Sequence, residues 1–173
     1  EFRRDSGIFQ PTAMRERVTE ITPEFLRSLG AKALLLDVDN TLATYTSHAP
    51  SPGSLEWVHA MGDAGFRMII ISNNYKKRVK SFGVKFGLDT LCFAIKPLPV
   101  GYLRAARRLK VKPRECVIIG DQIFTDIVGA NLCGMKSVLL TPMEEEEGFT
   151  FKARRALEKG LREKFRNRKD VLR

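Results

Sequence analysis

The sequence predicts a doubly wound α/β fold, in which helices cover both faces of an open, mostly parallel β-sheet. Two observations indicate this fold class. Short apolar runs of strand length alternate along the chain with segments of helical periodicity. In addition, polar clusters directly follow several of these runs, as at the carboxyl edge of a parallel sheet, where such folds bind their ligands.

Five short apolar runs are expected to form the strands, because buried parallel strands are nearly continuous in apolar residues. Lys96-Pro97 follows the third run, and since proline cannot donate to a strand ladder, Lys96 is expected to lie in a loop. The expected strands are residues 33–36, 68–71, 91–94, 116–119 and 137–140.

Amphipathic spacing predicts four helices between the strands. Local signals mark their ends: Ser51-Pro52-Gly53 opens the first, Asn74 can cap the second, and Gly134 follows the fourth. Right-handed crossovers then place helices on both faces of the sheet. The helices are expected to span residues 51–64, 74–86, 100–109 and 125–132.

The first strand ends in Asp37-Val38-Asp39-Asn40-Thr41, which places two carboxylates at the edge of the sheet. Two carboxylates this close resist double ionisation unless a cation or a shared proton compensates. The pair therefore indicates a metal site, a nucleophile with an acid, or both. For this motif alone, aspartates that cap the following turn are an equally good explanation.

Polar residues also follow the later strands, namely Ser72, Lys96, Asp121 and Asp126. Each has a local explanation: Ser72 can cap a helix, Lys96 can be a solvated charge, and the two aspartates can serve a helix N-terminus. Together with Asp37 they are the groups needed for phosphoryl transfer through an aspartyl intermediate. In that chemistry a carboxylate attacks phosphorus, a divalent cation and a lysine offset the charge, and a second carboxylate acts as acid and base.

These motifs, in this order, resemble those of haloacid dehalogenase superfamily phosphatases. More narrowly, the chain is similar to the subfamily IIIA group called YqeG, which is related to phosphatidylglycerophosphate phosphatases. The resemblance runs from about residue 21 to the basic helix that follows residue 149. Its motifs are Asp37-Val38-Asp39-Asn40-Thr41-Leu42, Ser72-Asn73-Asn74, Lys96-Pro97 and Gly120-Asp121-Gln122-x-x-Thr125-Asp126.

The resemblance implies a role for each motif residue. Asp37 would be the nucleophile, and Asp39 the general acid and base, with its backbone carbonyl on the metal. Mg²⁺ would be held at Asp37, Asp39 and Asp121, while Asp126 would support the metal or Lys96. The residues expected to bind the substrate phosphate are Thr41, Ser72, Asn73 and Lys96.

The fold implied by the resemblance is a haloacid dehalogenase-like Rossmannoid sheet without a large cap domain. Only residues 43–50 separate the first strand from the next helix, and residues 75–94 hold just one helix and one strand. Neither connection has room for a lid, so we expect an open site that accepts bulky or surface-bound substrates.

The expected function is a Mg²⁺-dependent phosphomonoester hydrolase, with phosphatidylglycerophosphate at the membrane surface as the substrate implied by the resemblance. The alternative substrate is a soluble phosphorylated metabolite such as a sugar phosphate or a nucleotide. Two further classes are less favoured. One is a phospho-switch module like a response-regulator receiver, in which the lysine follows the aspartates, whereas here Lys96 precedes Asp121. The other is a non-catalytic adaptor, which would not need both Asp39 and Lys96.

Length and composition predict one compact catalytic domain, because 173 residues with 43% hydrophobic content can bury one core. No stretch approaches the roughly 20 apolar residues of a membrane span, and no signal segment is recognised. We therefore expect a cytoplasmic protein, with peripheral binding at the inner membrane surface. The expected regions are an N-terminal segment packed on the domain (1–30), the phosphatase domain (31–150) and a basic amphipathic helix (151–173).

The last region carries ten Lys and Arg against three acidic residues, a net charge of +7. This charge and an apolar stripe are typical of a helix that contacts an anionic membrane. The interpretation favoured over it is that the stripe docks on the domain while the charges stay solvated. Nucleic acid is a less favoured partner, because no groove-reading or base-stacking module accompanies the charge. Residues 144–147, all glutamate, are expected to form a solvated loop. The stripe consists of Phe151, Leu157, Leu161 and Phe165.

Overall fold

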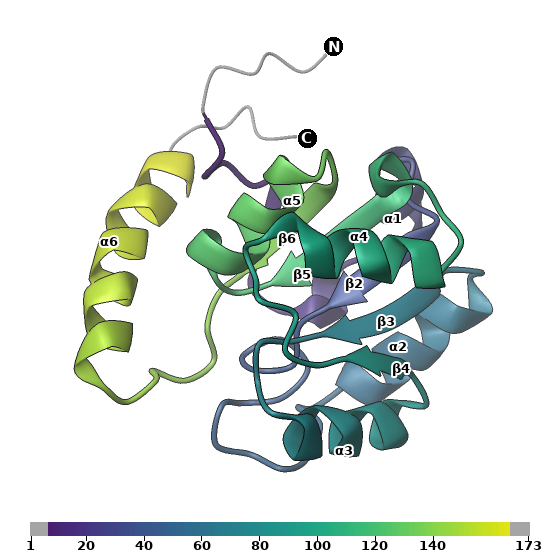
Figure 1. The fold of residues 1–173 in the computed structure, drawn as a ribbon, viewed down its shortest axis with the longest axis horizontal. Helices are drawn as coiled ribbons and strands as arrows, with labels where there is room; N and C mark the ends of the chain where they lie inside the picture. Colours follow the sequence, from purple (N-terminus) through teal and green to yellow (C-terminus); the bar gives the residue numbers. More distant parts are fainter. Residues whose placement is uncertain (1–6, 167–173) are drawn as a thin grey trace.

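A computed structural model describes residues 7–166 of the chain and confirms the predicted α/β class (Figure 1). Six strands form one sheet in the order β1-β6-β5-β2-β3-β4, and each neighbouring pair is parallel. The strands are β1 (Ala13–Arg15), β2 (Ala33–Leu36), β3 (Arg67–Ile71), β4 (Asp89–Leu91), β5 (Cys116–Gly120) and β6 (Lys136–Leu140).

β2 lies near the centre of the sheet, between β5 and β3. Its last residue, Leu36, is level with Ile119 on one side and Ile70 on the other. The chain continues from β2 to β3 on one side and reaches β5 later on the other. The crevice beyond the end of β2 is therefore the switch point of the topology, where open α/β sheets bind ligands.

Helices cover both faces of the sheet because side chains alternate along each strand. Leu34 and Leu36 contribute to one core cluster, while Ala33 and Leu35 contribute to the other. The first cluster packs under α1 (Pro23–Ser28), α2 (Ser54–Asp63) and α3 (Lys76–Phe86); the second packs under α4 (Pro99–Arg108) and α5 (Val128–Leu132), which lie in front in Figure 1.

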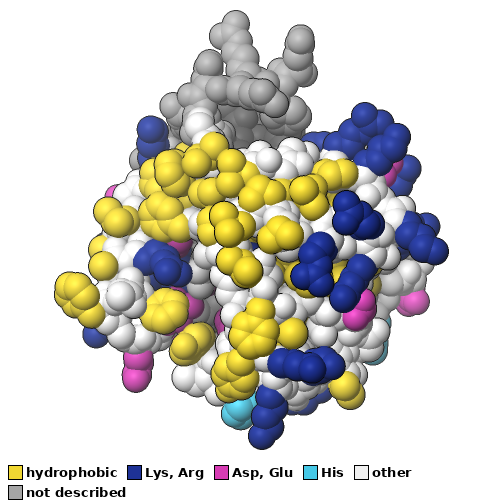
Figure 2. All heavy atoms as spheres, viewed as in Figure 1, with side chains coloured by type: hydrophobic (Ala, Val, Ile, Leu, Met, Phe, Trp, Pro, Cys, Tyr) yellow, Lys and Arg dark blue, Asp and Glu magenta, His cyan; other side chains and the backbone are white. Residues whose placement is uncertain are grey.

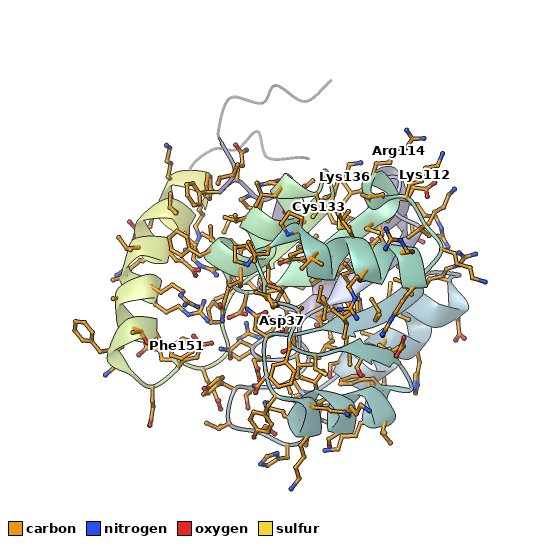
Figure 3. All side chains as sticks on the ribbon, in the orientation of Figure 1. Asp37, Lys112, Arg114, Cys133, Lys136 and Phe151 are labelled. Atoms are coloured by element: carbon orange, nitrogen blue, oxygen red, sulfur yellow. The ribbon has the colours of Figure 1, made fainter. Side chains whose placement is uncertain are left out.

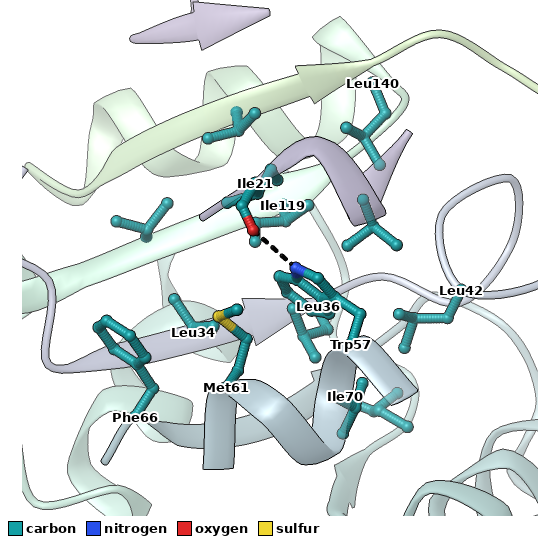
Figure 4. Packing of buried hydrophobic residues seen from close by; sticks show 14 of the residues in the cluster. Ile21, Leu34, Leu36, Leu42, Trp57, Met61, Phe66, Ile70, Ile119 and Leu140 are labelled. Carbon is teal, nitrogen blue, oxygen red and sulfur yellow. Dashed lines mark hydrogen bonds between the residues drawn. The ribbon is translucent and has the colours of Figure 1, made fainter. Parts of the chain in front are cut away.

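Figure 4 shows the first cluster, in which Trp57 and Met61 of α2 pack against Leu34 and Leu36. The indole N–H of Trp57 donates a hydrogen bond of 2.8 Å to the carbonyl oxygen of Ile21. A buried indole needs such a partner. This bond joins α2 to the chain that precedes α1, so the N-terminal segment contributes directly to the core.

The structure departs from the sequence-based elements at three places. The expected helix 125–132 begins within a π-helical turn (Ile123–Ile127) and continues as α5 from Val128. The N-terminal segment supplies β1, whose Ala13 pairs with Val138 at the edge of the sheet, and the short helix α1. The third expected strand, residues 91–94, is instead β4 at Asp89–Leu91. It ends early because Phe93 and Ile95 have φ angles of 49° and 55°, which no strand accommodates.

The C-terminal helix α6 (Phe149–Arg166) lies beyond the carboxyl edge of the sheet (Figure 1). The expected apolar stripe docks on the domain only in part. Phe165 is 3% exposed, and Leu161 packs beside it in a core cluster, whereas Leu157 is 66% exposed and Glu158 is fully buried. The expectation that the charges stay solvated is therefore wrong for this face. Between residues 7 and 166, no helix has the length and apolar content to cross a membrane. Residues 167–173 of the expected helix, and residues 1–6, lie outside the described part.

Candidate active site

The carboxyl ends of the central strands bring the expected site residues together. Asp37 directly follows β2, and its N–H donates a 3.0 Å hydrogen bond to Ile119 of β5. Ser72 directly follows β3, and Asp121 directly follows β5. Asp37 is labelled in Figure 3, where it lies at the edge of the sheet that faces α6.

Lys96 forms the centre of a buried ionic group. Its Nζ lies 3.1 Å from Asp37 Oδ2 and 2.7 Å from Asp126 Oδ1. Asp126 belongs to a π-helical turn (Ile123–Ile127) that follows β5, and its carboxylate packs where a side chain on Gly120 would collide with it. A glycine before Asp121 is thus a steric requirement of this arrangement.

Burial and neighbouring charges set the protonation of this group. Burial raises the pKa of the Asp37 carboxyl well above its ordinary value, although Lys96 opposes the rise. Burial alone would lower the pKa of Lys96, but the carboxylates of Asp126 and Asp37 outweigh it and raise the pKa. Lys96 is therefore a permanent cation, fixed between the two carboxylates.

Asn73 holds the loop that carries Lys96. The Asn73 amide accepts a 2.7 Å hydrogen bond from the Lys96 backbone N–H and donates one of 3.0 Å to the Lys96 carbonyl. Its predicted contact with phosphate stays a prediction, because these bonds use its side chain to position the lysine. Ser72 is buried, and its Oγ accepts a hydrogen bond from the N–H of Asn74.

Asp39 is held by two partners from the next crossover. Arg78 donates to Asp39 Oδ1 from Nη2 at 2.7 Å and from Nε at 3.0 Å, and Asn74 donates to Oδ2 at 3.0 Å. Arg78 is 8% exposed and also binds backbone carbonyls of the loop at residues 44–47. Sequence reasoning missed Arg78. A basic residue in the first turn of a helix opposes the helix dipole, but Lys76 and Lys77 share that turn and are exposed, so the sequence does not single out Arg78.

Asp121 is bound by α6, which the sequence did not predict. Nη2 of Arg155 lies 2.5 Å from Asp121 Oδ2, and Arg162 donates to the Asp121 carbonyl. Arg155 also contacts two further buried carboxylates, Glu146 at 3.0 Å and Glu158 at 3.1 Å. Burial raises the pKa of Asp121 to about 7, even though Arg155 lowers it.

Two members of the glutamate run, Glu144 and Glu146, contact the site, whereas Glu145 and Glu147 are exposed as expected for a solvated loop. Glu146 is 3% exposed and accepts from Gln122 and Arg155. The backbone of Glu144 exchanges two 3.0 Å hydrogen bonds with the side chain of Asn40, and its carboxylate binds Thr46. These contacts fix the loop after β2 against the loop before α6.

Two buried polar atoms among residues 7–166 have no hydrogen-bond partner, Thr41 Oγ1 and Asp121 Oδ1. Such atoms in a native site indicate an absent ligand or ion. Carboxylate oxygens of Asp37, Asp121 and Asp126 lie within 4.8 Å of one another, close enough to share a cation. An all-oxygen donor set suits Mg²⁺, so the residues present fit the predicted metal.

Comparison with known proteins supplies the family context. A family model described as haloacid dehalogenase-like hydrolase matches residues 2–134. The chain is 33% identical over 154 residues to "Probable phosphatase YqeG" of Bacillus subtilis, covering 89% of this chain and 90% of that one. It is 29% identical over 151 residues to "Phosphatidylglycerophosphate phosphatase 1, chloroplastic/mitochondrial" of Arabidopsis thaliana, covering 80% of this chain but only 42% of the plant protein.

Solved structures agree in fold. An uncharacterized protein from Listeria monocytogenes serotype 4b superposes with a TM-score of 0.55 at 16% identity, covering 68% of this chain and 85% of that one. NagD from E. coli K-12 superposes with a TM-score of 0.54 at 13% identity, covering 63% and 87%. At these identities the likeness concerns the fold alone.

Proposed function

The chain belongs to the haloacid dehalogenase-like hydrolases and is a phosphatase, and from this premise we propose a Mg²⁺-dependent phosphomonoester hydrolase that works through a phosphoaspartate at Asp37. The observation that carries the proposal is the unpartnered oxygen of Asp121 beside the buried Asp37–Lys96 pair. A cation bound at Asp121 would satisfy this oxygen. The Asp37 carboxylate is close enough to Asp121 to bind the same cation.

Mg²⁺ would be held by Asp37, Asp121 and the backbone carbonyl of Asp39, and would offset the repulsion between the Asp37 carboxylate and an anionic phosphate. Asp126 is proposed to position Lys96 rather than to bind the metal, because its Oδ1 already accepts a hydrogen bond from Lys96 Nζ.

In the first step Asp37 attacks phosphorus and the bond to the leaving oxygen breaks, while Asp39, as the general acid, passes a proton to the departing alcohol oxygen. In the second step Asp39 takes a proton from water, which attacks the phosphoaspartate and releases phosphate. Arg78 and Asn74 orient Asp39 for both proton transfers. Lys96, Thr41 and Ser72 would contact the phosphate oxygens.

The proposed substrate is phosphatidylglycerophosphate. Support comes from the similarity to a plant enzyme of that name, and from the short connection after β2, which leaves the site without a large lid. Peripheral contact with anionic membrane through residues 151–173 is also proposed, but Arg155 and Arg162 face the site, so such contact would depend on exposed lysines such as Lys159.

Phosphate release with Mg²⁺ from phosphatidylglycerophosphate in vesicles, beside sugar phosphates and nucleotides, tests the substrate. Preferential release from the lipid is expected; equal or greater release from a soluble phosphate would replace the lipid by the alternative substrate class. Asp37→Asn tests the mechanism, since an amide cannot form the acyl phosphate. Acid-stable trapping of labelled phosphate on this variant would refute the assignment of Asp37.

A further inference from the structure

Six large hydrophobic side chains lie exposed on one face of the molecule. They come from the loop after β4, from α4 and from the end of α5, and their exposed fractions range from 40% to 60%. Figure 2 shows hydrophobic side chains gathered on this face, in front of the sheet. We call these residues the apolar rim: Phe93, Ile95, Leu98, Val100, Leu103 and Leu132.

Close backbone contacts hold the three segments of the apolar rim together. A side chain at Gly101 of α4 would collide with the carbonyl oxygen of Ala94, so loop and helix touch directly. Cys133 Sγ lies 3.8 Å from the carbonyl oxygen of Pro99, which places the end of α5 beside the start of α4. The apolar rim is thus one continuous surface rather than scattered exposed residues, which would need no explanation.

Two of its members adopt an unfavourable backbone conformation. Phe93 and Ile95 have positive φ angles of 49° and 55°, a region that bulky and β-branched residues rarely enter. The result is that Ala94 and Lys96 turn inward and are buried, while Phe93 and Ile95 turn outward and are about 60% exposed. Strain that presents apolar side chains to water points to a use for the presented surface.

The apolar rim adjoins the site through the same loop. Lys96, the neighbour of Ile95, places its Nζ 3.1 Å from Asp37. The loop cannot move independently of the site, because Asn73 binds the Lys96 backbone on both sides. Anything that rests on the apolar rim is therefore held at a fixed position relative to Asp37.

Lys and Arg predominate around the apolar rim, although Asp89 pairs with Arg108 of α4 there. Residues 90–114 contain seven Lys and Arg and no Asp or Glu. Arg104 and Arg107 of α4 are exposed, as are Lys76 and Lys77 at the start of α3, and Figure 2 shows Lys and Arg flanking the hydrophobic side chains. An apolar surface with a basic border complements an anionic bilayer, whereas a second copy of a chain of net charge +10 would be repelled.

We propose that the apolar rim and its basic border are a docking surface for an anionic lipid bilayer, into which Phe93 and its neighbours insert. Docking there presents a headgroup phosphate to Asp37 without the lipid leaving the membrane. The inference deepens the proposed function, because its use rests on a lipid substrate, but the binding itself can be measured without turnover.

The test is co-sedimentation of the full chain with phosphatidylcholine vesicles, with and without phosphatidylglycerol, in the absence of substrate. The rim variant is Phe93→Asn with Leu103→Gln; asparagine tolerates positive φ and glutamine favours helix, so the fold should persist. The matched control is Leu157→Gln with Lys159→Gln, two exposed residues of α6. Turnover of p-nitrophenyl phosphate reports an intact site in both.

We expect the rim variant to bind anionic vesicles at least about tenfold more weakly, while the control stays within about twofold and both retain soluble turnover. Rim-variant binding equal to the parent, or loss confined to the α6 control, overturns the proposal. Failure of the parent to bind vesicles also overturns it; a parent dimer that the rim variant loses would then identify a second copy as the occupant. Binding by the parent without lipid hydrolysis refutes the proposed substrate and leaves the docking surface standing.

Discussion

Replacing Arg155 with glutamine removes a guanidinium that contacts three buried carboxylates. Asp121, Glu146 and Glu158 are at most 3% exposed, and Arg155 lies 2.5 to 3.1 Å from their oxygens. Glutamine can donate hydrogen bonds but brings no charge. Of these carboxylates, Glu158 retains Arg162 at 3.7 Å after the substitution.

The expected loss of unfolding free energy follows from this geometry. Removing one partner of a buried ion pair costs about 3 to 5 kcal/mol, because a charge is left unpaired. Proton uptake limits the cost at low pH, because burial raises the pKa values of Asp121 and Glu158, and loss of the Arg155 charge, which lowers both, raises them further. A carboxyl with a raised pKa in the folded state loses stability as pH rises through that value. The variant should therefore lose about 3 kcal/mol or more at pH 8 and clearly less at pH 6.

Mg²⁺ should restore part of the loss, because a cation at Asp121 would replace the missing charge. The assay is urea unfolding followed by far-UV circular dichroism at both pH values, in chelator and in Mg²⁺. Lys159→Gln, an exposed charge on the same helix, is the control and should change stability by less than about 0.5 kcal/mol. An Arg155 variant as stable as the parent at pH 8, or stabilised no more than the parent by Mg²⁺, would refute the reasoning.

Three further predictions concern the site itself. Lys96→Ala leaves Asp37 and Asp126 without their shared cation, so kcat on a soluble phosphate ester should fall by about 10²- to 10³-fold; a twofold change would contradict a catalytic role. Mg²⁺ affinity, measured by calorimetry, should weaken as pH falls from 8 to 6, because protons compete for Asp121 below its pKa of about 7; equal affinities would speak against that carboxylate as a ligand. Arg78→Lys cannot reproduce the two-nitrogen contact with Asp39 and should lower kcat more than it changes KM, and an unchanged pH profile would remove its positioning role.

The fold could be predicted to a large extent because buried parallel strands can be recognised in the sequence as short apolar runs. The central strands appear at the expected positions, and the family resemblance is confirmed by the matching family model and by the Bacillus subtilis relative. β1 was not predicted, because a three-residue edge strand is too short to show a periodic pattern of hydrophobic residues. β4 was misplaced because Leu91-Cys92-Phe93-Ala94 is apolar throughout, and apolarity alone does not reveal the positive φ of Phe93.

The site could be predicted where chemistry follows directly from a strand end. Asp37 and Asp121 are fixed by the ends of adjacent strands, and Lys96 contacts Asp37 and Asp126, whereas the catalytic roles of these residues stay predictions. Arg78 and Arg155 come from helices, where position along the chain does not say which side chain reaches a carboxylate. Long cationic side chains span distances that depend on how the helices finally pack.

The docking of α6 shows why hydrophobic periodicity misjudged the basic helix. Its buried face repeats at helical spacing through Arg155, Glu158, Arg162 and Phe165, so charges take positions that an apolar stripe would normally occupy. Composition cannot distinguish such a face from a solvated one, because the carboxylates that neutralise its buried charges lie elsewhere in the chain. Here those partners are Asp121 and the glutamate run just before the helix, whose negative charge complements the positive charge that follows it. An acidic loop directly preceding a basic helix therefore indicates ionic docking as readily as membrane binding. For this chain the exposed apolar rim, rather than the basic helix, is the stronger candidate for a lipid surface.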